Sequence, residues 1–409
     1  MHVVRSTCRA CDSSELELVL SFGEMPLADA LLLPNQLLEE EPRYPLDVVF
    51  CRKCSLVQIL QTVSPSVLYD ESYRYFSSNS DSIMAHSRAN AEGLIRDRHL
   101  GRDSFVVEIA SNDGYMLKNF HEQRIPVLGI DPAPGPAQAA RRAGIPTLPT
   151  FFTDSLARYL RDEGRQADVI LANNVLAHVP DLHGFLGGIR ILLKEDGIAV
   201  IEVPYVRNLI DECEFDTIYH EHLCYFSVTA LASMMRSAGL SLNDVEHFPV
   251  HGGSLRLHIG RNVEVSQRVE KYLKDEKDCG LTDFAYYQDF ARRALSIKER
   301  LITLLDELKA DGSRIVGYGA AAKGSTMLNY VGIDDRYLDY VVDRNVHKHG
   351  RFMPGVHLPV LAPEQLVEDV PDYALLLAWN FREEVLDQQR AYRERGGRFV
   401  VPIPEPTVV

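Results

Sequence analysis

The chain has no apolar run that approaches the ~20 residues a helix needs to cross a bilayer. It is also short of cations: 43 Lys and Arg stand against 58 Asp and Glu, which gives the 409 residues a formal net charge of −15. A basic footprint for nucleic-acid backbones is therefore missing. We expect no membrane and no nucleic-acid partner, whereas a small phosphorylated ligand, which needs only a few local cations or backbone amides, is compatible with this balance.

Cysteine is sparse, but four of the seven cysteines form two Cys-x-x-Cys pairs, Cys8 with Cys11 and Cys51 with Cys54. Two such turns supply the tetrahedral S₄ shell of structural zinc, and their separation predicts that they lie on two hairpins. Disulfides are the alternative, but no signal-peptide pattern precedes Cys8 and a chain of this size needs no staple. The remaining cysteines are scattered, as expected in a reducing cytoplasm: Cys213, Cys224 and Cys279.

The pattern of apolar stretches divides the chain into three parts. Residues 1–70 carry the cysteine pairs and predict a small zinc-binding module. Residues 71–262 alternate apolar strands with amphipathic helices, which is typical of a parallel doubly wound sheet. Residues 263–409 begin with helix to about residue 310 and continue as a second α/β unit. The predicted fold is therefore α/β, and its strands cover 105–109, 127–130, 169–172, 198–203, 314–319, 340–343, 374–378 and 399–403.

A tight turn follows the first of these strands, where residues 108–114 read Glu-Ile-Ala-Ser-Asn-Asp-Gly. The backbone of such a turn can approach a ligand closely and present helix N-terminal amides. The next strand ends in Asp131, where an acid about 20 residues after the turn can bind a ribose diol. Nucleotide-binding turns usually contain two or three glycines and this turn has only Gly114, so an ordinary βα turn is the alternative.

The densest cluster of ionisable residues is Tyr219-His-Glu-His222, downstream of strand 198–203. Ligands collect at the C-terminal edge of such a sheet. Histidine suits proton abstraction, because its unperturbed pKa of about 6.5 leaves it largely neutral at cellular pH. A second metal site is disfavoured because the His-x-x-x-His helical pair of zinc proteases is missing. A solvated helix end is the other alternative, and the neighbouring His220 competes with His222 for any role as a base.

A second nucleotide-like turn, Gly317-Tyr-Gly-Ala-Ala-Ala-Lys323, follows a strand and precedes a helix, and Asp343 ends the next strand. Taken alone, this turn favours an NAD-linked sugar-nucleotide oxidoreductase. Such an enzyme would leave the first α/β unit without a role, and the glycine spacing is imperfect. A non-catalytic zinc-ribbon scaffold with two degenerate Rossmann domains is a further alternative, which the cluster at 219–222 disfavours.

Together these motifs resemble the class I S-adenosylmethionine-dependent methyltransferases, and more closely the sugar C-methyltransferases of antibiotic deoxysugar pathways. The resemblance covers nearly the whole chain, with motifs in one order at 8–54, 73–78, 112–114, 174–178, 219–222, 250–253 and 317–323. It implies structural zinc, a central class I methyltransferase domain that binds S-adenosylmethionine, and a C-terminal Rossmann-like domain that helps to hold the nucleotide. The implied substrate is a small molecule, a dTDP-linked 4-keto-deoxysugar.

The resemblance also implies roles for individual residues. Carbon methylation beside a ketone, at C3 or C5, requires an enolate, a general base and donors for the developing oxyanion. The base maps onto His222, and the other catalytic residues onto Glu221, Tyr219, His178 and Tyr75. Cofactor-binding residues map onto Glu108, Ala110, Asn112, Gly114, Tyr115, Asp131, Pro132, Phe152, Asn173 and Asn174. Substrate-binding residues map onto Tyr73, Tyr75, Ser78, His251, Gly252, Gly317, Tyr318, Gly319, Ala320, Lys323 and Asp343. The oligomeric state does not follow from the sequence, which is compatible with a monomer.

Overall fold

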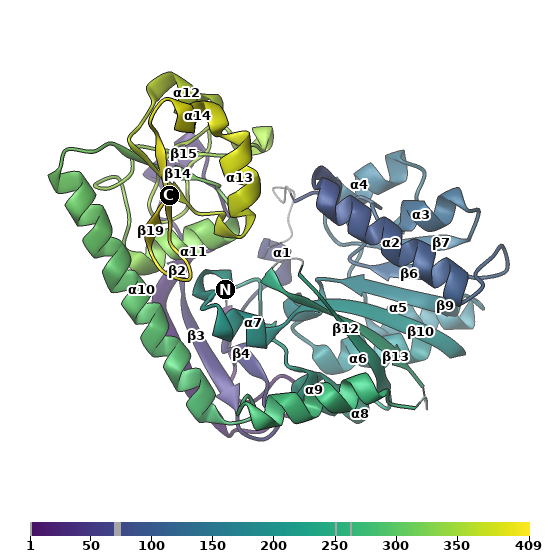
Figure 1. Cartoon of the computed structure of the whole chain (residues 1–409). Coiled ribbons are helices and arrows are strands. Elements are labelled where there is room, and N and C mark those ends of the chain that lie inside the picture. Colours follow the sequence, from purple (N-terminus) through teal and green to yellow (C-terminus); the bar gives the residue numbers. More distant parts are fainter. Residues whose placement is uncertain (1, 69–74, 250–251, 262–263) are drawn as a thin grey trace.

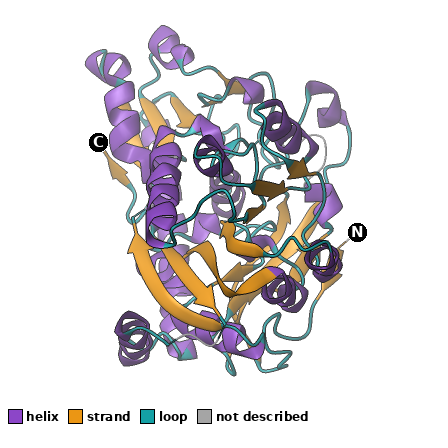
Figure 2. Ribbon diagram, turned by 90° about the vertical axis from the view of Figure 1, so that its right-hand side faces the viewer, coloured by secondary structure: helices purple, strands orange, loops and turns teal. Residues whose placement is uncertain are grey.

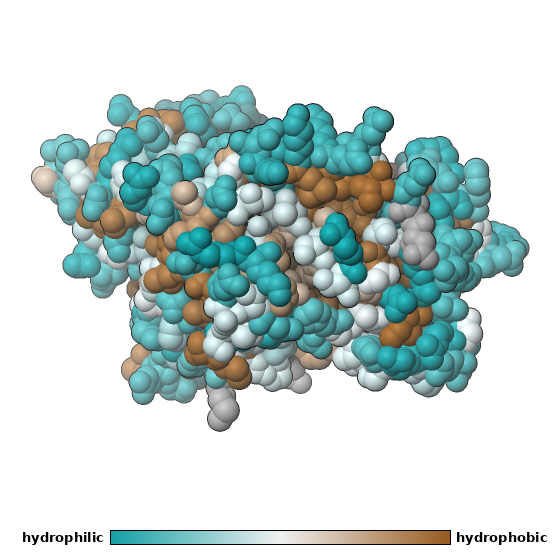
Figure 3. Space-filling model, turned by 90° about the horizontal axis from the view of Figure 1, so that it is seen from below, coloured by the Kyte–Doolittle hydropathy of each residue, from teal (hydrophilic) through white to brown (hydrophobic). Residues whose placement is uncertain are grey.

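The computed structural model describes residues 2–68, 75–249, 252–261 and 264–409, which form three sheet-based units lying side by side (Figure 1). Two residues predicted to bind substrate, Tyr73 and His251, lie outside the described residues. No described helix is both long and apolar enough to span a bilayer. The face seen in Figure 3 is mainly hydrophilic, with apolar areas scattered between the charged side chains.

The N-terminal unit is a four-stranded antiparallel sheet in the order β11-β4-β3-β2. A short pair outside this sheet joins β1 (His2–Val4) to β5 (Gln61–Val63). One strand of the sheet comes from far along the chain, directly after the Tyr-His-Glu-His run, so the zinc module and the candidate catalytic segment share backbone hydrogen bonds. The strands are β2 (Leu16–Pro26), β3 (Arg43–Cys51), β4 (Val57–Ile59) and β11 (Cys224–Tyr225).

The central unit is a seven-stranded sheet in the order β12-β13-β10-β9-β6-β7-β8, parallel except for β13, which runs antiparallel to both neighbours. β6 and β7 are apolar and buried on both faces, as parallel strands covered by helices require. The four strands predicted here are present and three more were not predicted. The strands are β6 (Val106–Ile109), β7 (Val127–Ile130), β8 (Thr147–Leu148), β9 (Ala167–Asn173), β10 (Leu193–Pro204), β12 (Ser241–Phe248) and β13 (Ser254–Gly260).

Helices cover both faces of this central sheet (Figures 1 and 2). One face packs against α2 (Asp81–Asp97), α3 (Leu117–Glu122) and α4 (Pro134–Arg142). The other face packs against α5 (Asp154–Asp162), α6 (Leu182–Leu192) and α8 (Val228–Ser237). This three-layer arrangement is the predicted α/β architecture, and it leaves the carboxyl ends of the parallel strands along one edge.

The predicted helical stretch that follows is two helices, α9 (Gln267–Asp278) and α10 (Phe284–Ala310), separated near Gly280, whose φ is +81°. The buried carboxylate of Glu276 in α9 accepts hydrogen bonds from the first amides of α8, at Val228 (2.7 Å) and Thr229 (2.8 Å). The helix α9 is therefore tied to the central unit, whereas α10 runs along the zinc module to the C-terminal unit (Figure 1).

The C-terminal unit is a six-stranded sheet in the order β16-β15-β14-β17-β18-β19, parallel except for β19. All four strands predicted for it are present. The helix α11 (Ala322–Val331) follows the glycine-containing turn, as expected, and packs against the zinc module at β2. The strands are β14 (Ile315–Tyr318), β15 (Val341–Val342), β16 (Val360–Leu361), β17 (Tyr373–Leu376), β18 (Arg398–Val401) and β19 (Thr407–Val408).

Candidate active site and zinc site

The four paired cysteines form one cluster, in which all the sulfur atoms lie within 4.8 Å of one another. Cys8 Sγ lies 3.5 Å from Cys54 Sγ and Cys11 Sγ lies 3.6 Å from Cys51 Sγ, and none is in a disulfide. A tetrahedral Zn²⁺ with Zn–S bonds of ~2.3 Å separates its sulfurs by roughly 3.8 Å. The cluster therefore fits zinc, and the four predicted thiolates lie together as such a site requires.

The two cysteine turns differ in their setting. Cys51 and Cys54 lie in the β3–β4 hairpin, whereas Cys8 and Cys11 lie between β1 and β2, which pair with different strands. The prediction of two hairpins is therefore wrong for the first turn. β1 pairs with β5, which lies far away in the sequence, and the local residue pattern does not indicate such a pairing. Arg9, unpredicted and almost fully buried, anchors this turn through bonds to the backbone carbonyls of Ile59 and Gln61 and to Thr62 Oγ1.

The turn after β6 contains three residues in the left-handed region: Ala110 (φ 56°), Asn112 (φ 49°) and Gly114 (φ 80°). Only the last must be glycine, because a Cβ there would lie 3.0 Å from Ile145 Cγ1. Ala110 and Asn112 adopt the left-handed backbone without being glycine, so the turn keeps this conformation with a single glycine.

Asp131 lies at the end of β7, beside this turn. Its carboxylate oxygens accept the backbone N–H groups of Asn112 and Ala133, both at 2.8 Å. Burial raises the pKa of Asp131 to about 6, against these two hydrogen bonds. Asp131 thus holds the turn in place, and its predicted contact with a ribose stays a prediction.

Buried acceptors lie behind the turn. The Asn173 side chain is a polar neighbour of the Glu108 carboxylate, whose two oxygens need more donors than it supplies, and Asn173 Oδ1 has no hydrogen-bond partner among the described residues. Burial, and after it the charges of Asp131 and Asp113, raise the pKa of Glu108 well above its ordinary value. Buried acceptors of this kind require donors, and the ammonium and ribose hydroxyls of S-adenosylmethionine are donors. The residues present therefore fit the predicted cofactor.

The segment predicted to face the substrate lies directly on the cofactor turn. Asn112 Oδ1 accepts the Ser77 N–H at 2.9 Å, and its Nδ2 donates to the Tyr75 carbonyl at 3.1 Å. Asp113 Oδ2 accepts the Ser78 N–H at 3.3 Å. The sequence did not reveal this second role of the Asn-Asp pair, because it depends on a contact with a segment 35 residues earlier.

His222, the residue predicted to act as the base, has a fixed ring orientation. Its Nδ1 lies 2.8 Å from the Thr217 carbonyl, and its Nε2 lies 3.1 Å from Tyr219 Oη. Because a carbonyl can only accept, Nδ1 carries the proton and the neutral ring has its lone pair on Nε2. The rings of Tyr219 and His222 lie 4.1 Å apart, so the phenol and the imidazole form one unit.

The other two histidines are placed very differently. His178, in η3 (Leu176–His178), lies with its ring centroid 4.9 Å from that of His222. Burial, and then the charge of His222, lower the pKa of His178 to about 3, so it is neutral near pH 7. His220 instead points into the zinc module, where its Nε2 meets the Pro45 carbonyl at 3.0 Å. The structure thus groups His222 with His178 and Tyr219, and separates His220 from them.

Glu221 is the remaining member of the run. Burial, with a smaller contribution from the nearby Asp29 carboxylate, raises the pKa of Glu221 to about 8. Glu221 is therefore protonated at neutral pH and can donate a hydrogen bond. Asp29, which follows β2 of the zinc module, was not predicted as a neighbour of this site.

The glycine-containing turn of the C-terminal unit resembles the turn after β6, because in both an aspartate at the end of the next strand accepts two backbone N–H groups. Asp343 Oδ2 accepts the Ala320 N–H and its Oδ1 accepts the Asn345 N–H, both at 2.7 Å. A Cβ on Gly319 (φ +100°) would lie 2.7 Å from Ala378 Cβ, so glycine is required there. The side chain of Tyr318 does not reach the turn surface, because it is buried against Phe399.

Lys323, at the start of α11, lies at the junction of the C-terminal and central units. Its Nζ donates to Asn380 Oδ1 and lies 4.9 Å from the Trp379 ring centre. Burial lowers the pKa of Lys323, and the carboxylates of Asp216 and Glu214 oppose this shift. A Cβ on Gly252 (φ +83°), a predicted substrate residue, would lie 2.5 Å from Glu214 Oε1. These two acids were missed, because only the tertiary fold brings them to Lys323.

The other predicted cofactor residues surround the first turn or the sheet edge. Tyr115 is almost fully buried behind the turn, and Pro132 follows Asp131. Phe152 packs on α6, where its ring lies 5.6 Å from that of Phe185. The backbone N–H of Asn174 donates to the Glu202 carbonyl at 2.9 Å.

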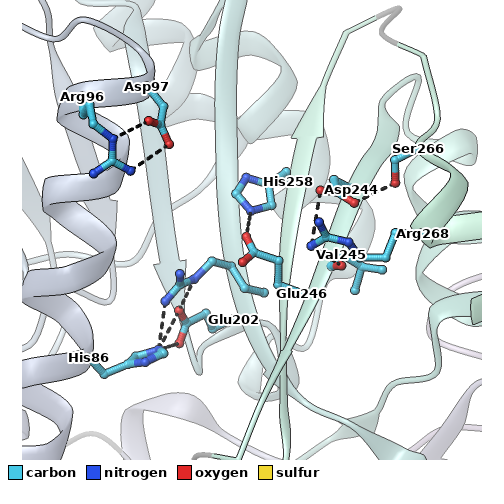
Figure 4. A network of polar contacts seen from close by, with 11 residues as sticks. His86, Arg96, Asp97, Glu202, Asp244, Val245, Glu246, His258, Ser266 and Arg268 are labelled. Atoms are coloured by element: carbon cyan, nitrogen blue, oxygen red, sulfur yellow. Dashed lines mark hydrogen bonds and ion pairs between the residues drawn. The ribbon is translucent and has the colours of Figure 1, made fainter.

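Glu202 also belongs to a buried charged cluster that was not predicted. Its Oε1 lies 2.7 Å from Arg256 Nε, and both oxygens lie 3.0 Å from His86 Nε2. Figure 4 shows Glu202 and His86 pointing toward each other between α2 and the sheet. Burial opposes ionisation, yet His86 and Arg256 hold the pKa of Glu202 below its usual range. The cluster forms because Glu202 in β10 lies opposite Arg256 in the antiparallel strand β13. This pairing was not predicted, because β13 was not predicted as a strand.

Three family models match the chain in succession. They are described as "Putative zinc binding domain" at residues 8–69, methyltransferase domain at 85–245 and C-methyltransferase C-terminal domain at 249–404. C-methyltransferase NovU of Streptomyces niveus is 37% identical over 405 residues, which cover 98% of this chain and 96% of that protein. The chain belongs to the C-methyltransferases. The resemblance predicted from the motifs is thereby confirmed, with S-adenosylmethionine and zinc as the cofactors of this methyltransferase.

Two more distant similarities each cover less than half of this chain. The ubiquinone biosynthesis O-methyltransferase of Azorhizobium caulinodans is 27% identical over 122 residues, which cover 27% of this chain and 48% of that protein. The solved structure of magnesium protoporphyrin IX methyltransferase from Synechocystis PCC 6803 with bound SAM is 13% identical, with a TM-score of 0.35. That match covers 48% of this chain and 89% of the other.

Proposed function

We propose that this methyltransferase methylates the carbon beside the ketone of a dTDP-4-keto-deoxysugar, at C3 or C5, through an enolate in deoxysugar and antibiotic biosynthesis. The proposal includes a cytoplasmic location, where zinc thiolates stay reduced. It rests on the motif resemblance and on one observation: the hydrogen bond from His222 Nδ1 to the Thr217 carbonyl leaves a lone pair on Nε2 beside a phenol.

In this proposal His222 Nε2 removes the proton from the carbon beside the ketone. The neutral His178 ring, 4.9 Å away, adds no positive charge that would oppose the imidazolium formed. The protonated Glu221 supplies an O–H donor for the enolate oxygen. The Tyr219 O–H donates to Nε2 before the reaction and, in this proposal, turns to the enolate oxygen as Nε2 takes the proton of the substrate. S-adenosylmethionine, held at the turn of residues 108–114, supplies an electrophilic methyl group for the carbon.

The remaining predicted residues hold the substrate. The turn of Gly319 and Ala320, with Lys323 behind it, opens toward the N-terminus of the ten-residue helix α11 and is suited to the diphosphate. Tyr75 and Ser78 lie on the cofactor turn, where they can contact the sugar.

Incubation of the purified protein with candidate dTDP-4-keto-deoxysugars and S-adenosylmethionine tests this proposal. We expect a product heavier by one methylene, with the new methyl on C3 or C5 by NMR. In deuterated solvent, the carbon that exchanges should be the one that is methylated. Methylation of an oxygen or nitrogen, or no reaction with any keto sugar, would contradict the proposal.

A further inference from the structure

The candidate base is held through the turn that precedes it. Thr217 is the last residue of η4 (Phe215–Thr217), and its carbonyl accepts a hydrogen bond from Nδ1 of His222. Thr217 Oγ1 donates to the Glu214 carbonyl at 2.8 Å, which closes this turn. A displacement of η4 would therefore rotate the carbonyl that fixes the tautomer and the direction of the His222 ring.

The C-terminal unit holds η4 at three points. Trp379 Nε1 donates to Asp216 Oδ2 at 2.7 Å, and Thr326 Oγ1 donates to the Ile218 carbonyl at 3.3 Å. The rings of Phe215 and Tyr330 lie 5.3 Å apart. Two of these contacts come from α11, whose first turn carries Lys323, so one helix meets both the predicted diphosphate site and the catalytic turn.

In the contact between Trp379 and Asp216, the Asp216 carboxylate has a strong need for a hydrogen-bond donor. It is fully buried, and its Oδ1 has no hydrogen-bond partner among the described residues. Burial raises the pKa of Asp216 to about 6, against the nearby Lys323 and the Trp379 hydrogen bond. Loss of the indole N–H would remove a side-chain hydrogen-bond donor from a buried carboxylate, which disfavours the native position of η4.

We propose that Trp379 and Asp216 are positioning residues, through which the C-terminal domain holds η4 and thereby aims His222 Nε2. Both residues act on η4, and in this proposal their effect reaches His222 through the Thr217 carbonyl. The inference rests on the proposed role of His222 as the base.

The decisive variant is Trp379→Phe, which keeps a ring and removes the N–H. We expect kcat to fall about ten- to a hundredfold, as for a small misplacement of a catalytic group, with unchanged affinity for S-adenosylmethionine. Asp216→Ala should behave in the same way, whereas Asp216→Asn, which keeps an acceptor for the indole, should retain most of kcat. If Trp379→Phe fails to fold, Thr326→Val is the alternative variant. It removes the hydrogen bond from Thr326 Oγ1 to the Ile218 carbonyl, and we expect a loss of kcat in the same direction.

Glu41→Gln is the matched control. Glu41 also joins the zinc module to the C-terminal domain, by accepting from Gly355 N at 2.8 Å and from His357, but it does not touch η4. We expect wild-type turnover from this variant. An equal loss in Glu41→Gln would overturn the proposal, because general loosening of the domains would then explain the effect, and wild-type turnover in Trp379→Phe would overturn it directly.

A second readout needs no substrate. In ¹⁵N-histidine NMR spectra, the signal that is lost in His222→Asn should show a protonated Nδ1 in the wild type and a mixture of tautomers in Trp379→Phe. An unchanged tautomer in Trp379→Phe would overturn the inference. Absence of turnover of any dTDP-keto sugar by the wild type would instead refute the proposed function and leave this NMR test intact.

Discussion

The imidazole rings of His178 and His222 lie 4.9 Å apart at an angle of 72°. Two cationic rings at this distance would repel each other, so the pair holds at most one proton beyond neutrality near pH 7. The pKa of His178 is lowered to about 3, by burial and then by the charge of His222, so this ring stays neutral near pH 7. A neutral His178 ring beside His222 suits the proposed role of His222 as the base.

The pH profile of turnover should depend on Glu221. Its carboxyl, with a pKa of about 8, donates when protonated below that pH and loses its proton above it. We expect kcat to fall as the pH rises through about 8. Glu221→Gln, whose amide donates at every pH, should lose this alkaline decline, and an unchanged decline in that variant would assign it to another group, such as Glu214, whose pKa burial also raises to about 8.

Zinc should be required for the stability of the catalytic segment as well as of its own module, because β11 pairs with β4. Elemental analysis should find about one zinc per chain. Cys8→Ser or Cys54→Ser should lose the metal and lower Tm, whereas Cys279→Ser, at an exposed cysteine outside the cluster, should change neither. Full stability of metal-free protein would refute a structural role for the site.

Binding of S-adenosylmethionine should depend on Asp131. Asp131→Ala removes the acceptor for the Asn112 and Ala133 amides and the predicted ribose contact, so we expect affinity to fall about ten- to a hundredfold by calorimetry. Asp103→Ala, an exposed acid before β6 at the opposite edge of the sheet, is the control. Unchanged affinity in Asp131→Ala would place the ribose elsewhere.

Arg256 should be important for stability. Arg256→Met leaves the buried Glu202 carboxylate without its closest cation, and breaking such a pair typically costs about 3–5 kcal/mol. Arg158→Ala, which removes a solvent-exposed pair with Asp154, should change the stability little, because water screens such a pair. Thermal unfolding of the two variants compares them, and equal small shifts in Tm would show that Glu202 finds another donor or becomes protonated.

The sequence predicted those features that local patterns determine. The strands at 127–130 and 314–319, the cysteine cluster and the turn at Gly114 all follow from short runs of residue types. It did not predict β11, the Glu202–Arg256 pair or the Trp379–Asp216 contact, because these join segments 54 to 168 residues apart and carry no local periodicity. Likewise, only the tertiary fold directs His220 toward Pro45 and leaves His222 with Tyr219.

Solvent deuterium exchange at the carbon beside the ketone, in the absence of methyl transfer, tests the central role of His222 most directly. His222→Asn should bind both ligands yet lose about 10²–10⁴-fold in exchange and turnover, as expected when a general base is removed. His178→Asn and Tyr219→Phe should lose less, and His220→Asn should exchange at the rate of the wild type if it folds. Exchange at the wild-type rate in His222→Asn would contradict the account and move the base to another residue.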